Sequence, residues 1–188
     1  MPEAALAAGC QCDPVVENWQ ELRDRAVALD LLEVSPGEAI RVPRILDRSL
    51  DNDGLDENRL LVLNNAAAAI LYRLWWQEAE GNSSEQALEL VRLGLLAKNQ
   101  EIAVEVGDSI ATYWVNRSRY GEALALCSQI LEVFQDYRIF GAIARAEVVL
   151  GLVDEAIEHY ESALAQCPDD DVQGKAASLH MMAGVIAQ

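Results

Sequence analysis

Few side chains of this 188-residue chain have the types and spacing that catalysis needs. The two histidines, His159 and His180, lie in helical patterns without a serine, cysteine or aspartate constellation beside them in the sequence. We interpret His159 as a solvated helix residue rather than a general base. The motifs Gly-x4-Gly-Lys-Ser/Thr, His-Glu-x2-His and Gly-x-Ser-x-Gly do not occur. The sequence therefore predicts a protein that is not an enzyme.

Metal sites are not predicted either. The pair Cys10-x-Cys12 has no second cysteine or histidine pair beside it, whereas tetrahedral sites usually need four ligands. The loop 51–54 is similar to the start of a calcium loop, but Ser49 and Leu60 occupy the positions that would need acidic ligands. We expect Cys127 to be a small buried hydrophobic residue. The sequence predicts neither a metal nor another cofactor.

Charge and hydropathy restrict the class of partner. The formal net charge is −17, and the chain has only two lysines. Nucleic-acid binding depends largely on basic residues that neutralise phosphates, so we do not expect it here. The start of the chain lacks the basic region of a secretory signal, and no apolar run approaches the roughly 20 residues that span a bilayer. We expect a cytoplasmic protein that does not enter a membrane.

The clearest helical pattern of the chain follows Gly151 and ends before Pro168. Its residues Ala156, Tyr160 and Ala163 recur at helical spacing on one face. This stretch resembles the second helix of a tetratricopeptide repeat, whose pattern is Trp-x2-Leu-Gly-x2-Tyr, then Ala-x3-Phe, then Pro, over about 34 residues. The resemblance implies a scaffold of paired helices that binds a partner.

The same pattern recurs upstream. Ala123 precedes Ala156 by 33 residues (156 − 123), and Ala87 precedes Ala123 by 36 (123 − 87), which is close to one helix-turn-helix unit. We expect Ser84 to cap the helix that contains Ala87. The other helices expected in the array cover residues 60–78, 86–97, 102–116, 122–134, 137–150 and 175–188.

The helix expected over 137–150 supplies the first half of the best-preserved repeat. Phe140, Ile143 and Ala144 stand where the family has its tryptophan, leucine and glycine. Glu147 stands where the family has a tyrosine, which is a departure from the pattern.

The predicted fold is mainly α, an α–α superhelix of tetratricopeptide-like hairpins over 56–188 preceded by a smaller segment over 1–55. A β-hairpin is expected near 31–43, and with the helix before it this segment resembles a winged helix. Residues 29–34 and 40–46 also resemble a segment of the STAND class of signalling ATPases, in which a winged helix leads into helical repeats. That resemblance implies an ATPase module outside this chain.

Two other interpretations of the segment 1–55 remain open. It could bind DNA through Arg41, Arg44 and Arg48, although three arginines in an acidic chain make a weak basic patch. The hairpin could instead be an irregular element that caps the helical array.

The resemblance to tetratricopeptide repeats places the binding surface on the polar, concave face of the first helices. The candidate partner-binding residues are Glu105, Asp108, Thr112, Arg138 and Arg145. Arg145 opposite Asp108 and Thr112 would make a groove of mixed charge, and ordinary salt bridges between repeats are the alternative. The lysine and asparagine cluster with which the family clamps C-terminal carboxylates does not occur here.

The end of the array leads to two functional hypotheses. The helix over 175–188 has no partner, which leaves Leu179, Met182 and Ile186 uncovered, whereas natural arrays end in a polar cap. We therefore expect a truncated last repeat in the interaction or sensor region of a larger STAND-type regulator, with a protein or peptide partner and possible self-association through the terminal repeat. The alternative is a free-standing adaptor that scaffolds a cytosolic complex and whose last helix is the cap.

Overall fold

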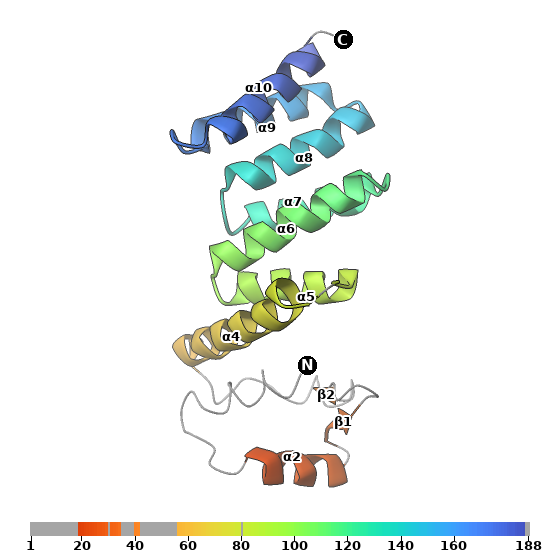
Figure 1. Cartoon of the computed structure of the whole chain (residues 1–188), viewed down its shortest axis with the longest axis vertical. Helices are drawn as coiled ribbons and strands as arrows, with labels where there is room; N and C mark the ends of the chain where they lie inside the picture. The colour runs from red at the N-terminus through yellow and green to blue at the C-terminus, as the bar shows by residue number, and fades with distance from the viewer. Residues whose placement is uncertain (1–18, 30, 35–39, 42–55, 80, 187–188) are drawn as a thin grey trace. The chain divides into compact units, whose positions relative to one another are not determined.

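The computed structural model describes residues 19–29, 31–34, 40–41, 56–79 and 81–186, and it is mainly helical with consecutive helices packed together. Its elements are α2 (Trp19–Ala28), β1 (Glu33–Val34), β2 (Ile40–Arg41), α4 (Glu57–Tyr72), the π-helical turn η1 (Arg73–Gln77), α5 (Ser84–Leu96), α6 (Gln100–Val115), α7 (Tyr120–Leu131), α8 (Tyr137–Leu150), α9 (Val153–Gln166) and α10 (Val172–Ile186) (Figure 1). Contacts divide the chain into two units: Met1–Asn82 with Leu96–Lys98, and Ser83–Leu95 with Asn99–Gln188.

The first unit contains one short antiparallel strand pair within the range expected for a hairpin. Glu33 pairs with Arg41 and Val34 pairs with Ile40. The assignment of this pair to a winged helix stays a prediction. The cysteines at 10 and 12, the arginines at 44 and 48, and the proposed domain boundary near residue 55 lie outside the described residues.

The long helix expected over 60–78 changes its hydrogen-bonding pattern near its end. α4 begins after Asp56, whose carboxylate accepts a hydrogen bond from the Arg59 backbone N–H at 2.7 Å. After Tyr72 the chain forms a π-helical turn, closed by a 2.9 Å hydrogen bond from the Glu78 N–H to the Arg73 carbonyl. An i→i+5 bond has no sequence signature of the kind that predicts an α-helix, so the sequence indicated one continuous helix.

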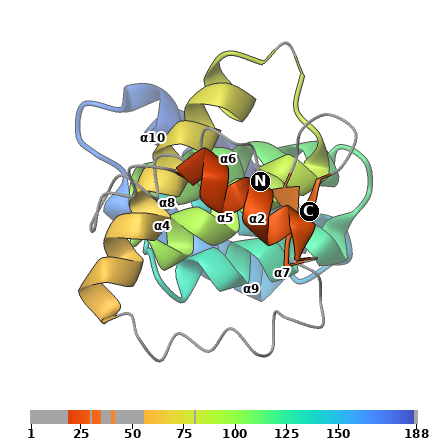
Figure 2. The ribbon, with the colours of Figure 1, turned by 90° about the horizontal axis from the view of Figure 1, so that it is seen from below.

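The second unit contains two layers of helices. α6 packs beside α8 and α8 beside α10, while α7 and α9 lie behind them and fill the spaces between (Figure 1). Figure 2, seen from below along the stacking direction, shows α7 and α9 along one side of this unit. The alanines that mark the expected repeats, Ala87, Ala123 and Ala156, are all buried, which confirms the predicted packing face.

Small residues let the helices approach closely. A β-carbon added at Gly94 of α5 would lie 2.9 Å from the Ala103 backbone nitrogen of α6. One added at Gly107 of α6 would overlap the end of the Ile130 side chain of α7. Larger side chains at these two glycines would therefore push neighbouring helices apart.

The start of α5 corrects the predicted cap by one residue. The Ser83 hydroxyl accepts a 3.2 Å hydrogen bond from the Gln86 backbone N–H, and the Gln86 side-chain oxygen accepts a 3.0 Å bond from the Ser83 N–H. Ser83, rather than Ser84, is thus the cap residue. The reciprocal arrangement is a capping box, which needs a glutamine or glutamate three residues after the serine, and only Ser83 has one.

Candidate functional site

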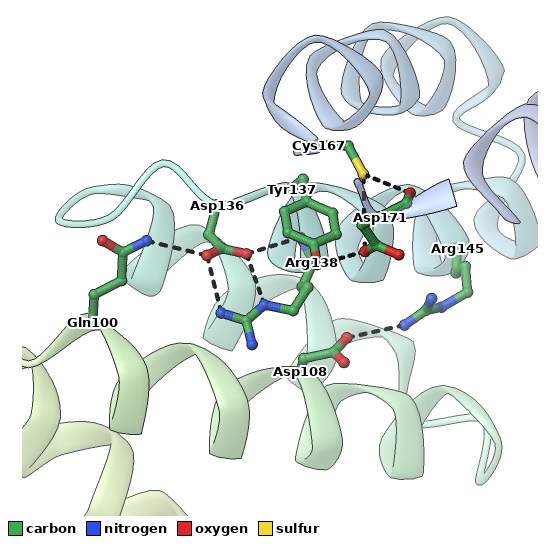
Figure 3. A network of polar contacts seen from close by, with 8 residues as sticks. All are labelled: Gln100, Asp108, Asp136, Tyr137, Arg138, Arg145, Cys167 and Asp171. Atoms are coloured by element: carbon green, nitrogen blue, oxygen red, sulfur yellow. Dashed lines mark hydrogen bonds and ion pairs between the residues drawn. The ribbon is translucent and has the colours of Figure 1, made fainter. Parts of the chain in front are cut away.

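One arginine joins the adjacent helices α6 and α8 on the face that carries the predicted site. The Arg145 Nη2 group lies 3.3 Å from the Asp108 Oδ1 (Figure 3). It also donates to the Thr112 hydroxyl at 2.8 Å. The Arg145 and Asp108 side chains are 33% and 34% exposed, so solvent reaches both. The structure therefore brings Arg145 against Asp108 and Thr112, which precede it by 37 and 33 residues and which we expected to lie opposite it.

Burial acts on the Asp108 carboxyl more strongly than its partner does. Desolvation raises the pKa of Asp108, and the Arg145 guanidinium offsets this increase only in part. The carboxylate is therefore less stable in its charged form than an exposed aspartate would be.

A second arginine lies at the beginning of α8. The Arg138 guanidinium binds the Asp136 carboxylate through two hydrogen bonds of 3.1 Å each, and the Gln100 side-chain amide of α6 donates to the same carboxylate at 3.1 Å (Figure 3). Asp136 also caps α8 by accepting from the Arg138 backbone N–H at 3.0 Å. This carboxylate orients Arg138 and fixes the start of the helix together.

Asp136 shows how hydrogen bonding can outweigh burial. Burial would raise the pKa of this carboxyl, but the side chain and backbone of Arg138 and the Gln100 amide together hold it below its usual value. Sequence reasoning missed Asp136 and Gln100. An aspartate directly before a helix signals a cap, whereas the contact with Gln100, 36 residues away, depends on how the helices stack.

Gly141 separates the two arginines on α8. Gly141 comes three residues after Arg138 and four before Arg145, which places all three on one face of the helix. A β-carbon added at Gly141 would meet no other atom within 4 Å. Gly141 itself is buried, so the face has a residue without a side chain between two guanidinium groups. Glu105, the remaining predicted residue, lies one turn before Asp108 on α6 and is partly exposed.

A third set of polar contacts ties the start of α8 to the turn before α10. The Tyr137 hydroxyl donates to the Asp171 Oδ2 at 2.8 Å (Figure 3), and the Gly174 N–H donates to the Asp171 Oδ1 at 2.9 Å. The Gly174 N–H and the Tyr137 hydroxyl lower the pKa of Asp171, and the bond to Asp171 raises the pKa of Tyr137 to about 12. The Cys167 thiol lies 3.6 Å from the Asp171 carbonyl oxygen.

His159 is partly exposed, at 29%, and it also makes contacts that the sequence did not predict. Its Nδ1 atom lies 2.8 Å from the Glu147 Oε2, and its ring stacks on Phe140 with centroids 5.9 Å apart. Glu147 is only 5% exposed, and burial raises its pKa despite the hydrogen bond with His159. The glutamate that replaces the family's tyrosine thus packs against the second helix of the hairpin, and the two residues form a contact between α8 and α9.

Cys127 fits its predicted role. It is completely buried, and burial raises the pKa of its thiol to about 12, so the reactive thiolate does not form near neutral pH. Within the described residues, no three His, Cys, Asp or Glu side chains are grouped so that they could hold a metal ion. None of the helices in the described ranges has the length and apolar character needed to cross a membrane.

Comparison of the chain with protein-family models, with curated proteins and with solved structures gives no match in any of the three.

Proposed function

We propose that this chain is a non-catalytic interaction region that binds a peptide or protein segment across the exposed face of α6 and α8. Its helical hairpins would be tetratricopeptide-like repeats forming an α–α superhelix. Support comes from the spacing of Phe140, Ala144, Ala156, Tyr160 and Pro168, which follows the family pattern, and from the burial of the first four.

One observation carries the binding proposal: two partly exposed guanidinium groups, each oriented by a carboxylate, lie on one face of α8 with Gly141 between them. Arg138 and Arg145 are each held by a carboxylate, and their side chains remain 38% and 33% exposed. A guanidinium has five N–H donors, more than these contacts use. Such groups can bind the carbonyl or carboxylate oxygens of a partner that lies close to Gly141.

The existing ion pairs favour binding more than they favour folding. Ion pairs that solvent can reach contribute only about 0–1 kcal/mol to folding. By contrast, a side chain that is already held in one orientation loses less conformational freedom when a partner binds. We therefore assign the Arg145–Asp108 pair to partner recognition, while the buried Asp136 also has a role in helix capping.

The test is selection of random linear peptides on the immobilised wild-type chain, followed by fluorescence anisotropy with the enriched peptides. Arg145→Ala should weaken their binding by about tenfold or more, because a hydrogen bond to a charged group is lost. Arg92→Ala is the matched control, since Arg92 is also in a solvent-accessible ion pair, with Glu89 of α5.

Thermal unfolding of both variants separates a binding effect from a folding effect. Arg92→Ala should unfold close to the wild-type temperature, because it loses one solvent-accessible ion pair. Arg145→Ala also loses the hydrogen bond to Thr112, so its free energy of unfolding should fall by about 1–2 kcal/mol while the chain stays folded. The proposal fails if no peptide is enriched, or if the enriched peptides bind Arg145→Ala and the wild type with equal affinity.

The larger context of this region is a separate part of the proposal. The segment before the array resembles the winged-helix end of a STAND-type regulator, which would make the chain the sensor region of a cytoplasmic signalling ATPase. The alternative is a free-standing adaptor. The flanking gene sequence distinguishes them, because a phosphate-binding loop upstream supports the regulator and an isolated reading frame supports the adaptor.

A further inference from the structure

An open, mainly apolar hollow of about 400 Å³ lies between α8 and α10. Its lining residues are Val148, His180, Met181, Ala183, Gly184 and Val185. All but His180 are apolar or small, so the hollow offers little polar recognition of its own.

The floor of the hollow belongs to the packed core. Val185 is 7% exposed and forms a cluster with Ala144, Ala156 and Tyr160, against which Val148 is also packed. Because tightly packed core side chains keep fixed positions, the hollow is a property of the fold rather than of one loose side chain. Met181, at its rim, is 39% exposed.

The hollow and the arginine site lie on opposite flanks of one helix. Arg145 extends from α8 toward α6, and Val148, one turn later on α8, lines the hollow toward α10. Residues three apart on an α-helix are neighbours, with Cβ atoms about 5–6 Å apart, and an extended peptide rises about 3.3 Å per residue. About two residues of a partner would therefore extend from one feature to the other.

We infer that the hollow is the anchor site for a large apolar side chain, such as leucine, methionine or phenylalanine, of a partner segment that crosses α8. This inference rests on the proposed function, because the same segment would place its carbonyl or carboxylate oxygens at Arg145. At about 400 Å³ the hollow has room for one such side chain, and its mainly apolar lining suits an apolar group.

A second copy of this chain is the less suitable occupant. Each copy has a formal net charge of −17, and like charge opposes close association. A partner that presents an apolar side chain without that charge has no such cost.

The anchor site can be tested without knowing the partner, with N-acetyl-phenylalaninamide as the probe and N-acetyl-alaninamide as its small counterpart. Methyl NMR spectra of the chain should show the Met181, Val148 and Val185 signals shifting on titration with the phenylalanine derivative. That derivative should bind about tenfold or more tightly than the alanine derivative, because it removes more apolar surface from water.

Two glycine substitutions supply the decisive comparison. Neither Gly184 nor Gly121 has another atom within 4 Å of an added β-carbon, so both accept a larger side chain without a clash at that atom. Gly184→Leu places a side chain in the hollow and should abolish the methyl shifts. Gly121→Leu, on α7, should leave them unchanged.

The inference is overturned if the methyl signals do not move, if both derivatives move them equally, or if Gly184→Leu responds as the wild type does. These outcomes are independent of the peptide selection. If peptides that depend on Arg145 are enriched but the methyl signals do not shift, the proposed function stands and only the anchor site is removed. If the methyl signals shift but no peptide is enriched, the proposed function is removed and only the apolar binding site remains.

Discussion

The hairpins α6–α7 and α8–α9 place their bulky residues differently. In α6–α7, Gly107 of the first helix leaves room for Ile130 of the second. In α8–α9, Ala144 occupies the first helix and Tyr160 is the large residue of the second, between the smaller Ala156 and Ala163. The comparison teaches that this packing requires a small residue opposite a large one, but allows the pair to change position from hairpin to hairpin.

The two hairpins also differ in their turns. α8 ends at Gly151, which has a φ of 78°, and its N–H bonds to the Val148 carbonyl at 3.1 Å. The turn between α6 and α7 instead places Ser118 at a φ of 59°. A left-handed conformation costs a residue with a β-carbon about 1–2 kcal/mol, a cost that glycine does not have. The α8–α9 turn is therefore the less strained of the two.

The largest expected difference comes from removing the bulky residue of α8–α9. Tyr160→Ala should lower the free energy of unfolding by about 3–5 kcal/mol, measured by urea denaturation. Cys127→Ala, at the corresponding position of α7, should have a smaller effect because it removes one atom. Equal losses would show that the two hairpins do not differ in this way.

Tyr160→Phe should be neutral or stabilising, because the hydroxyl has no hydrogen-bond partner among the described residues.

The glycine of α6 supplies the next largest effect. Gly107→Ala should cost about 1–3 kcal/mol, because the new methyl group overlaps Ile130. Gly141→Ala is the matched control on α8, where the space is open and a helical glycine is replaced by a better helix former; it should stabilise by up to about 1 kcal/mol. Thermal unfolding would show whether each variant is more or less stable than the wild type. A loss of stability at both positions would contradict the difference between the two glycines.

Removing the glycine of one turn and adding a glycine to the other should change the free energy of unfolding in opposite directions. Gly151→Ala forces a β-carbon into the left-handed region and should destabilise by about 1 kcal/mol. Ser118→Gly relieves such a conformation and should stabilise by less than that, because glycine also gains freedom in the unfolded chain. Chemical denaturation of both variants tests the pair, and a loss of stability in Ser118→Gly would remove the strain assigned to that turn.

The smallest effect concerns Glu147, a buried carboxyl at a position where α6 has an apolar residue. Gly107 of α6 and Ala144 of α8 occupy the same position in their hairpins. Three residues later, α6 has Ile110 and α8 has Glu147. Because burial raises the pKa of Glu147, the folded state binds its proton more tightly than the unfolded state does. The contribution of this carboxyl to stability therefore falls as pH rises from the unfolded value of about 4.3 through the raised folded value.

Glu147→Gln has no such titration. Its free energy of unfolding, minus that of the wild type, should increase as pH rises through the same window, and urea denaturation at several pH values would measure the difference. A difference that decreases with pH would mean that the contact with His159 outweighs burial.

The sequence predicted the strongly periodic parts of the fold and missed contacts that depend on stacking. The ends of α8 and α9 follow from Gly151 and Pro168, which punctuate a regular apolar pattern. The bond between Gln100 and Asp136 and the pairing of Glu147 with His159 each need two helices at a particular rotation. Local propensity does not determine that rotation, so the sequence could name Arg145 as a candidate but could not find the residues that orient Arg138.

The π-helical turn Arg73–Gln77 gives the chain one residue of adjustable length. A ring closed from Glu78 to Arg73 encloses one residue more than an α-helical ring does. Deleting one residue from 73–77 would therefore let the turn close as ordinary α-helix, while α4 before it keeps its packing face. Elsewhere in a helix the same deletion would rotate every later side chain by about 100°. Changes of chain length at this turn are thus the ones that evolution, or a designer, could introduce with the least disturbance to α4.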